Sequence, residues 1–218
     1  MRVTVAVLAF NRLHLLKRTL ASMDADPGAP FARVLVDGGS HDVELRAFVA
    51  ERGGLLLGPP SATVAHNTNV AIGLALETDP DLVVFSADDM EYKPRWLERL
   101  LSFWRAVPDS IPLASLNWEP LYPWNVVQKN VMIGGERTLI RPGIPGSSLS
   151  FRAEDWAFIG PMRGREPGTE DKDLCKRMAA MGYKLAALDL ADHIGEREST
   201  WGNMAWTHAQ PLVLDWSQ

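Results

Sequence analysis

Cysteine is nearly absent from the 218-residue sequence, which contains only Cys175. A single cysteine excludes an internal disulfide and a cysteine-rich metal site, and it suits a reducing compartment. Long apolar runs are missing too, so no segment reaches the length of a membrane-spanning helix. The apolar N-terminus is interrupted at Phe10-Asn11-Arg12 without a cleavage-site pattern. We therefore expect a first buried strand rather than a signal peptide, and a cytoplasmic protein.

Positive charge is not in excess, because the formal net charge is -5. This balance argues against general affinity for nucleic acids, although it leaves a local basic patch open. Glycine-rich phosphate loops of the dinucleotide-binding or P-loop type do not follow the first apolar run. The remaining composition, 46% hydrophobic and 22% charged, is that of an ordinary globular protein. The length fits a single domain over residues 1–218.

The first half of the sequence alternates short apolar runs with segments of helical periodicity. This alternation predicts an open, mostly parallel α/β sheet with helices on both faces. Asn11 is expected to cap the first helix, and Pro94 to start the fourth. The predicted strands lie at residues 2–9, 33–36, 55–57 and 81–86, and the predicted helices follow Asn11, cover about 42–52 and 64–77, and follow Pro94.

The second half is less regular. Residues 110–152 are rich in Pro, Trp and Asn and contain short β-like pieces. Within them, Trp118 and Trp124 can form a stacking surface for a sugar or a base, or they can form a satellite core. A further helix is predicted to begin near Glu170.

Two adjacent carboxylates, Asp88 and Asp89, follow the fourth predicted strand. Such a pair repels itself unless a cation lies between the carboxylates or water solvates them. Hard oxygen ligands at this position suit Mg²⁺ or Mn²⁺, completed by substrate phosphates and water. The alternative is a turn or a helix cap whose carboxylates face solvent.

Asp37 ends the second predicted strand and is followed by Gly38-Gly39. Its carboxylate can accept a hydrogen bond from the imino group of a nucleobase, while the glycines let a ligand approach the backbone. The alternative is an Asx-type turn, which Asp-Gly sequences form readily. His193 lies after the last strong strand, and its imidazole is either structural or an additional metal donor.

Glu170 and Asp171 open an amphipathic helix whose core face we expect at Leu174, Met178 and Met181. Acids in a first helical turn are stabilised by the helix dipole, so simple capping explains them. The functional interpretation is that one of them is a general base, kept ionised by the same helix terminus and directed at an acceptor hydroxyl.

Individually these motifs are weak, but their order along the chain resembles that of family 2-type glycosyltransferases. In that family a first strand ends in a Thr-Tyr-Asn-Arg-like turn and a second ends in Val-Asp-Asp-Gly-Ser. The matching segments cover about residues 3–195 and are Val5–Arg12, Val34–Ser40, Asn67-Thr68-Asn69, Val83–Asp89, Gly146-Ser147-Ser148, Gly160-Pro161 and Thr169–Arg177 with Gly182. Ala9, Gly38 and Ala87 depart from the pattern, where the family has Thr, Asp and the first acid of an Asp-x-Asp motif.

The resemblance implies a single GT-A-type, Rossmann-like domain. About 1–105 would form its nucleotide-sugar-binding half and about 106–218 its acceptor-binding half. It implies that the donor nucleotide binds Ala9, Asn11, Asp37, Asn67 and Asp88, that Asp89 and His193 bind the metal, and that Asp171 is the catalytic base. The acceptor-side or supporting positions are Glu170, Ser147, Trp118 and Trp124.

The function that the resemblance implies is metal-dependent, inverting transfer of a sugar from a nucleotide-diphosphate sugar, with UDP favoured, to an acceptor hydroxyl. Mn²⁺ or Mg²⁺ would be the cofactor. The acceptor stays open among a glycan, a small molecule, a protein and a modified nucleic-acid base, as does the oligomeric state. A nucleotidyltransferase that makes sugar nucleotides is one alternative, although Phe10-Asn11-Arg12 lacks the glycine-rich basic loop it needs. A non-catalytic nucleotide-sugar-binding module is the other.

Overall fold

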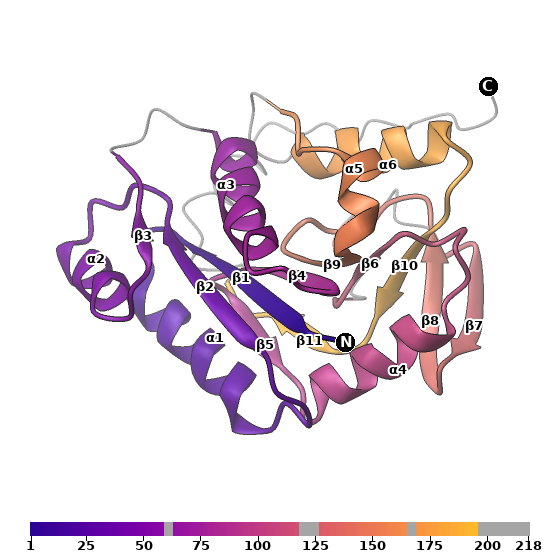
Figure 1. Ribbon diagram of the computed structural model, residues 1–218, viewed down its shortest axis with the longest axis horizontal. Helices are drawn as coiled ribbons and strands as arrows, with labels where there is room; N and C mark the ends of the chain where they lie inside the picture. The colour runs from indigo at the N-terminus through magenta and orange to yellow at the C-terminus, as the bar shows by residue number, and fades with distance from the viewer. Residues whose placement is uncertain (59–62, 118–126, 165–168, 196–218) are drawn as a thin grey trace.

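The computed structural model describes residues 1–58, 63–117, 127–164 and 169–195 (Figure 1). In this part of the chain, one nine-stranded sheet has the order β3-β2-β1-β4-β9-β6-β10-β8-β7, and a separate two-stranded sheet pairs β5 with β11. The strands are β1 (Val3–Ala9), β2 (Ala32–Asp37), β3 (Leu55–Leu56), β4 (Leu82–Ala87), β5 (Met90–Tyr92), β6 (Leu113–Ser115), β7 (Lys129–Ile133), β8 (Glu136–Arg141), β9 (Ser148–Arg152), β10 (Leu185–Leu188) and β11 (Ala191–His193).

Most of the large sheet is parallel. Strand β1 pairs in parallel with β2 and β4, and β2 pairs in parallel with β3. Strand β9 is antiparallel to both β4 and β6, whereas β10 returns to the parallel direction beside β6. The hairpin of β7 and β8 closes this end of the sheet, with β8 antiparallel to β10. The predicted mostly parallel α/β sheet is confirmed.

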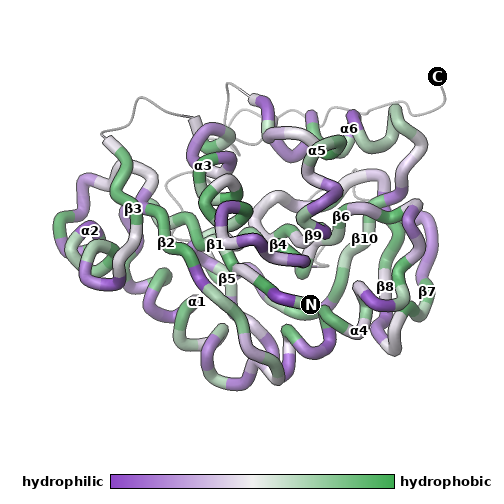
Figure 2. The backbone as a smooth tube through the Cα atoms, in the orientation of Figure 1, coloured by the Kyte–Doolittle hydropathy of each residue, from purple (hydrophilic) through white to green (hydrophobic). Residues whose placement is uncertain are grey.

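Helices cover both faces of the sheet (Figure 1). One face packs against α1 (Leu13–Ala25), α2 (Val43–Ala50) and α4 (Trp96–Ala106). The other face packs against α3 (Val64–Leu76), α5 (Trp156–Ile159) and α6 (Glu170–Ala180), and the short 3-10 helix η1 (Ala153–Asp155) precedes α5. Hydrophobic positions follow the central strands, while hydrophobic and hydrophilic positions alternate along α1 and α2 (Figure 2). This is the pattern expected of a sheet that is buried between two helical layers.

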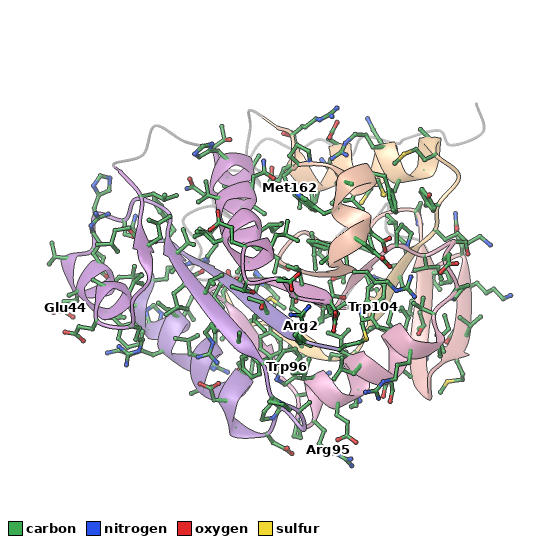
Figure 3. The ribbon with its side chains drawn as sticks, viewed as in Figure 1. Arg2, Glu44, Arg95, Trp96, Trp104 and Met162 are labelled. Atoms are coloured by element: carbon green, nitrogen blue, oxygen red, sulfur yellow. The ribbon has the colours of Figure 1, made fainter. Side chains whose placement is uncertain are left out.

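The predicted apolar stripe of α4 is confirmed as core. Trp96, Trp104, Leu97 and Leu100 are fully buried, and Leu101 is buried except for a small part of its surface. Each tryptophan also satisfies its indole N–H: Trp96 donates to the carbonyl of Met23 at 3.1 Å, and Trp104 donates to the hydroxyl of Ser150 at 3.1 Å (Figure 3). The helix begins at Trp96 rather than at Pro94, because Arg95 has a left-handed conformation with φ 56.

The two-stranded sheet was not expected from the sequence. Strand β11 pairs antiparallel with β5, which places His193 opposite Met90. The chain after β10 therefore returns to the end of β4. In the described part of the chain, no helix has the length and apolarity to cross a membrane.

Candidate active site

The carboxyl ends of β1, β2 and β4 lie side by side. Ala9 is in register with Asp37, and Leu8 is in register with Ala87. Because these strands are parallel, the loops that follow them leave the sheet at one edge, where open α/β sheets bind their ligands. The sheet thus gathers the residues predicted to bind the donor.

Asn11 ties the loops after β1 and β2 together, and the prediction that it caps α1 is wrong. It has a left-handed φ of 56, and α1 begins only at Leu13, with Arg12 at the capping position. The backbone N–H of Asn11 donates to Ser40 Oγ at 2.9 Å, and Asn11 Oδ1 accepts from the N–H of His41 at 2.7 Å. Asparagine tolerates this conformation better than most residues.

Asp37 is completely buried and forms the Asx-type turn that was the alternative to nucleobase binding. Its two carboxylate oxygens accept from the backbone N–H of Ser40 at 3.1 and 3.3 Å. Its Oδ2 also accepts from Arg46 Nη1 at 2.7 Å, and the same nitrogen donates to the carbonyl of Leu57. Asp37 therefore organises the loop after β2, and each carboxylate oxygen keeps acceptor capacity for a ligand.

Asn67, on α3, closes the opposite side of this loop. Its Nδ2 donates to the carbonyl of Gly38 at 3.0 Å, and the N–H of Gly38 donates to the carbonyl of Ala9 at 2.8 Å. A Cβ atom on Gly38 would lie 2.9 Å from Asn67 Nδ2, so only glycine fits here without displacing Asn67. Asn67 Oδ1 is buried and has no hydrogen-bond partner among the described residues. Asn67 thus brings an unused acceptor to the predicted nucleotide site.

Asp88 and Asp89 are buried, with 1% and 4% of their surface exposed. This rules out the interpretation in which both face solvent. The cation between them is the guanidinium of Arg12: Nη2 contacts Asp88 Oδ1, and Nη1 donates to Asp89 Oδ2 at 2.6 Å. Asp88 Oδ2 also accepts from the N–H of Phe10 at 2.9 Å. The sequence left open whether a cation or water relieves the repulsion between the two carboxylates, and it did not identify Arg12.

The two carboxyl groups differ in acidity. Burial, opposed by Arg12 and assisted by the neighbouring charge of Asp89, raises the pKa of Asp88 to about 7. Burial also acts to raise the pKa of Asp89, but His193 and Arg12 outweigh it, so the net shift is downward. Asp89 is therefore the more readily ionised member of the pair.

His193 reaches Asp89 through the pairing of β11 with β5. Its Nε2 lies 3.2 Å from Asp89 Oδ2, although the two residues are far apart in the sequence. The backbone continues past Asp89 at close range: Ile194 N–H donates to the carbonyl of Asp89, and a Cβ atom on Gly195 would lie 2.5 Å from Asp89 Oδ2. Gly195 is thus required for the close contact between this segment and the carboxylate.

Thr19, which the sequence pattern did not single out, supports the backbone of the acidic pair. It is buried on α1, where its hydroxyl donates to the carbonyl of Asp88 at 2.8 Å and accepts from the N–H of Met90 at 3.1 Å. The hydroxyl thus provides a hydrogen-bond partner for two backbone groups just after the end of β4. Thr19 therefore fixes the backbone that carries both carboxylates.

A divalent cation fits one side of Asp89. Asp89 Oδ1 is buried without a hydrogen-bond partner among the described residues, and an imidazole lies next to the same carboxylate. The described part of the chain contains no group of three or more His, Cys, Asp or Glu side chains able to hold a metal. A carboxylate with one imidazole suits Mg²⁺ or Mn²⁺ only when substrate phosphates and water complete the coordination.

Asp171 is buried in the first turn of α6. Its Oδ1 accepts from the N–H of Lys172 at 2.8 Å, and a Cβ atom on Gly146 would lie 3.1 Å from the Asp171 Cβ. Burial and the neighbouring charge of Glu170 together raise the pKa of Asp171 to about 6, against hydrogen bonds from the backbone of Lys172 and Gly146. This is an acidity at which a carboxylate works well as a general base near neutral pH.

The predicted core face of α6 is correct except at one position. Leu174 and Met178 are buried, but Met181 is 47% exposed because the helix ends at Ala180. Cys175, which was not expected on this face, is buried in the core together with Leu174 and Met178. Asp171 therefore lies on a helix that is held by other residues.

The segment before β9 connects the acidic pair to Asp171. Ser147 accepts, through its carbonyl, a 2.7 Å hydrogen bond from the N–H of Ala87, which directly precedes Asp88. Its neighbour Gly146 contacts Asp171. Ser147 Oγ is buried without a partner among the described residues. The structure thus brings Ser147 to the predicted site, whereas Trp118 and Trp124 lie outside the described residues.

Two further residues, unremarked as site residues in the sequence, hold the chain between α5 and α6. Asn69 on α3 exchanges hydrogen bonds with the backbone of Met162, at 2.9 and 2.7 Å. Arg177 on α6 contacts the carbonyl of Ile159 and donates to that of Pro161 at 2.9 Å. Met162 lies between α3 and α5 (Figure 3). These bonds fix the relative positions of α3 and α6, which carry Asn67 and Asp171.

Solved structures share this fold. The mannosyltransferase PcManGT from Pyrobaculum calidifontis, in complex with GDP-Man and Mn²⁺, superposes with a TM-score of 0.60 over 85% of this chain at 20% identity. S. aureus TarS 1–349 superposes with a TM-score of 0.61 over 90% of this chain at 15% identity. This chain spans 56% of the first structure and 61% of the second, less than two thirds of either. The GT-A fold is confirmed.

No curated protein matches the sequence. A family model does: the one described as glycosyl transferase family 2 matches residues 4–130, more than half of the chain. The matched segment includes the loops after β1 and β2, Asn67 and the acidic pair. The chain belongs to glycosyl transferase family 2.

Proposed function

We propose that this chain transfers a sugar from a nucleotide-diphosphate sugar to an acceptor hydroxyl. The observation that carries the proposal is the connection between two sites of different chemistry. Through Ser147 and Gly146, one short segment joins the backbone beside Asp88 to the carboxyl group of Asp171. A diphosphate at the first site and a hydroxyl at the second would place a sugar between them.

The nucleotide is proposed to bind the loops after β1 and β2. Asp37 and Asn67 both present buried acceptors there, and Asn11 holds the two loops together. Uracil and guanine each carry an imino N–H that such an acceptor can bind. We favour a UDP-sugar as donor, and the GDP-Man complex of PcManGT makes the guanine nucleotide the alternative to test.

Asp89 and His193 are proposed to hold Mn²⁺ or Mg²⁺, with the donor diphosphate completing the coordination. The bound cation would neutralise the charge that develops on the departing diphosphate. Support comes from the unpartnered Asp89 Oδ1 and the adjacent imidazole. Asp88 is proposed to contact the ribose, as the family resemblance implies.

Asp171 is proposed to act as general base. The acceptor oxygen forms a bond to the anomeric carbon as the bond from that carbon to the diphosphate oxygen breaks, and Asp171 takes the hydroxyl proton. An aliphatic hydroxyl is too weak an acid to ionise beforehand, so the proton moves as attack proceeds. Attack opposite the leaving group inverts the anomeric centre.

A single buried cysteine favours a reducing compartment, and we propose the cytoplasm as the location of this protein.

The pH dependence of transfer tests Asp171. The base acts only when deprotonated, so kcat/KM is expected to fall about tenfold per unit as the pH drops below about 6, the pKa of Asp171. Glu170→Gln removes the charge that raises this pKa, while Lys172 stays, so the acid limb should move to lower pH. The measurement is kcat/KM of both proteins at saturating metal, between about pH 4.5 and about pH 8. This range covers the titration of Asp171. Identical acid limbs would argue against Asp171.

Nucleotide recognition tests Asp37. Asp37→Ala should weaken nucleoside-diphosphate binding by about 1–3 kcal/mol, the cost of losing a hydrogen bond to a charged group. Arg46→Met is the matched control, because it removes the ion pair of Asp37 but keeps the carboxylate. Titration calorimetry with UDP and GDP measures the effect for each base. Equal affinity of Asp37→Ala and the parent for both nucleotides would remove Asp37 from the site.

One incubation separates the proposal from its alternatives. Sugar nucleotides with Mn²⁺ and candidate acceptors should release free nucleoside diphosphate. A nucleotidyltransferase would instead join a sugar phosphate to a nucleoside triphosphate, forming a sugar nucleotide and releasing pyrophosphate. A binding module would retain the donor and release nothing.

A further inference from the structure

The guanidinium of Arg12 occupies the position between the two carboxylates of Asp88 and Asp89. It enters from the loop after β1, and both of its terminal nitrogens are used, one on each carboxylate. Only 9% of Arg12 is exposed, so this cation is shielded from water. The guanidinium thus bridges the two carboxylates with charge-assisted hydrogen bonds, which are stronger than those between neutral groups.

The same contact limits access to Asp89. Its Oδ2 is shared by Arg12 and His193, and only Oδ1 lacks a hydrogen-bond partner in the described part of the chain. A divalent cation arriving alone would be repelled by the positive guanidinium within contact distance of its main ligand. It would also have only one free carboxylate oxygen to bind.

A diphosphate changes this balance. Guanidinium groups bind phosphate oxygens in the same fork geometry as carboxylates, and Arg12 has a buried Nε–H without a partner in the described residues. A donor diphosphate therefore offers Arg12 a new partner and offers the metal additional ligands at the same time. When Arg12 moves from the carboxylates to the diphosphate and the metal takes its place, every charge in the site remains paired.

We propose that Arg12 is a tethered cation that holds the acidic pair closed until a nucleotide diphosphate draws it away, so that the metal binds together with the donor. This inference rests on the proposed function, because it assigns an order of binding to the same site. The contact also explains how two adjacent acids can be buried side by side. It also makes Arg12 a positioning residue for the acidic pair.

Binding of Mn²⁺ without nucleotide tests the proposal directly. If Arg12 closes the site for more than nine tenths of the time, Arg12→Met should bind Mn²⁺ at least about tenfold more tightly than the parent. The free Mn²⁺ is followed by electron paramagnetic resonance, which requires no catalysis. In the parent, adding UDP or GDP should tighten Mn²⁺ binding, and this coupling should shrink by about the same factor in Arg12→Met.

Arg18→Met is the matched control. Arg18 lies on α1, which Arg12 directly precedes, and pairs with Glu91, two residues after Asp89, but it is largely exposed. Arg18→Met removes the same charge as Arg12→Met but leaves the contacts of the acidic pair intact, so this variant should bind Mn²⁺ like the parent. An equal gain in both variants would show a general charge effect and overturn the proposal, and so would Mn²⁺ binding to Arg12→Met that is unchanged or weaker.

Arg12→Lys provides a second variant, since Arg12→Met leaves two buried carboxylates without a cation and its folding must be verified by circular dichroism. Lysine keeps the charge but cannot reach both carboxylates with a planar fork. Its Mn²⁺ affinity without nucleotide should lie between those of the parent and Arg12→Met, and affinity no tighter than the parent's would overturn the proposal. Absence of Mn²⁺ binding in every variant, even with UDP and GDP, would overturn the proposed metal site as well. Sugar transfer, measured separately, tests the proposed reaction.

Discussion

Asp171→Asn is expected to lower the rate of sugar transfer by about 10²–10⁴-fold, the usual loss when a general base is removed. Asparagine keeps the size of the side chain and can still occupy the first turn of α6, but it cannot take the proton of the acceptor. Donor binding should be unchanged, because Asp171 faces Gly146 rather than the acidic pair. Single-turnover transfer rates and donor affinity, measured on the same preparations, check both parts.

Stability distinguishes this loss from unfolding. The folded pKa of Asp171 is about 6, above its usual 3.8, so the native state binds the proton more tightly than the unfolded state. Its favourable contribution is present below about pH 4 and is lost as the pH rises through about 6. Asp171→Asn should therefore melt no lower than the parent at pH 8. Transfer at the parental rate, or a product that keeps the donor's anomeric configuration, would refute the inverting mechanism.

Asp89→Ala is expected to abolish the Mn²⁺-dependent part of donor binding, and with it metal-supported transfer. The change removes the carboxylate with the unpartnered oxygen and leaves His193 as a single weak ligand. Arg12 keeps Asp88 as its partner, so the fold should persist. Thermal shifts with nucleotide, with and without Mn²⁺, measure the effect, because a ligand that binds the native state raises its melting temperature.

The matched control for Asp89→Ala is Asp192→Ala. Asp192 lies on β11 next to His193 in the sequence, but its carboxylate pairs with Lys93 at 3.2 Å. It should keep the full Mn²⁺-dependent shift. Undiminished activity of the parent in excess EDTA would contradict the metal requirement altogether.

Much of the fold follows from local patterns. Strands β1 and β4 are continuous apolar runs, which is typical of strands buried on both faces, and α4 has its apolar stripe at helical spacing. Strands β6 and β8 were not predicted, because short segments of mixed polarity adopt β-structure only when their neighbours in the sheet supply hydrogen bonds. The capping role of Asn11 was wrong for a related reason: loop-to-loop hydrogen bonds to Ser40 and His41 hold it in a left-handed conformation.

The sequence alone placed Asp37, Asp88 and Asp171 at or next to the ends of regular elements, and it showed that two adjacent carboxylates call for either a cation or solvating water. These features can be predicted because each one depends on residues that are only a few positions apart in the sequence. Only the tertiary structure showed that Arg12 lies between these carboxylates, and it placed His193, which the resemblance had assigned to the metal with Asp89, 3.2 Å from that carboxylate. Arg12 and Asp88 are 76 positions apart, and β11 meets β5 across the fold. Contacts at such separations depend on how the sheet orders its strands and where the chain returns, which no local pattern specifies.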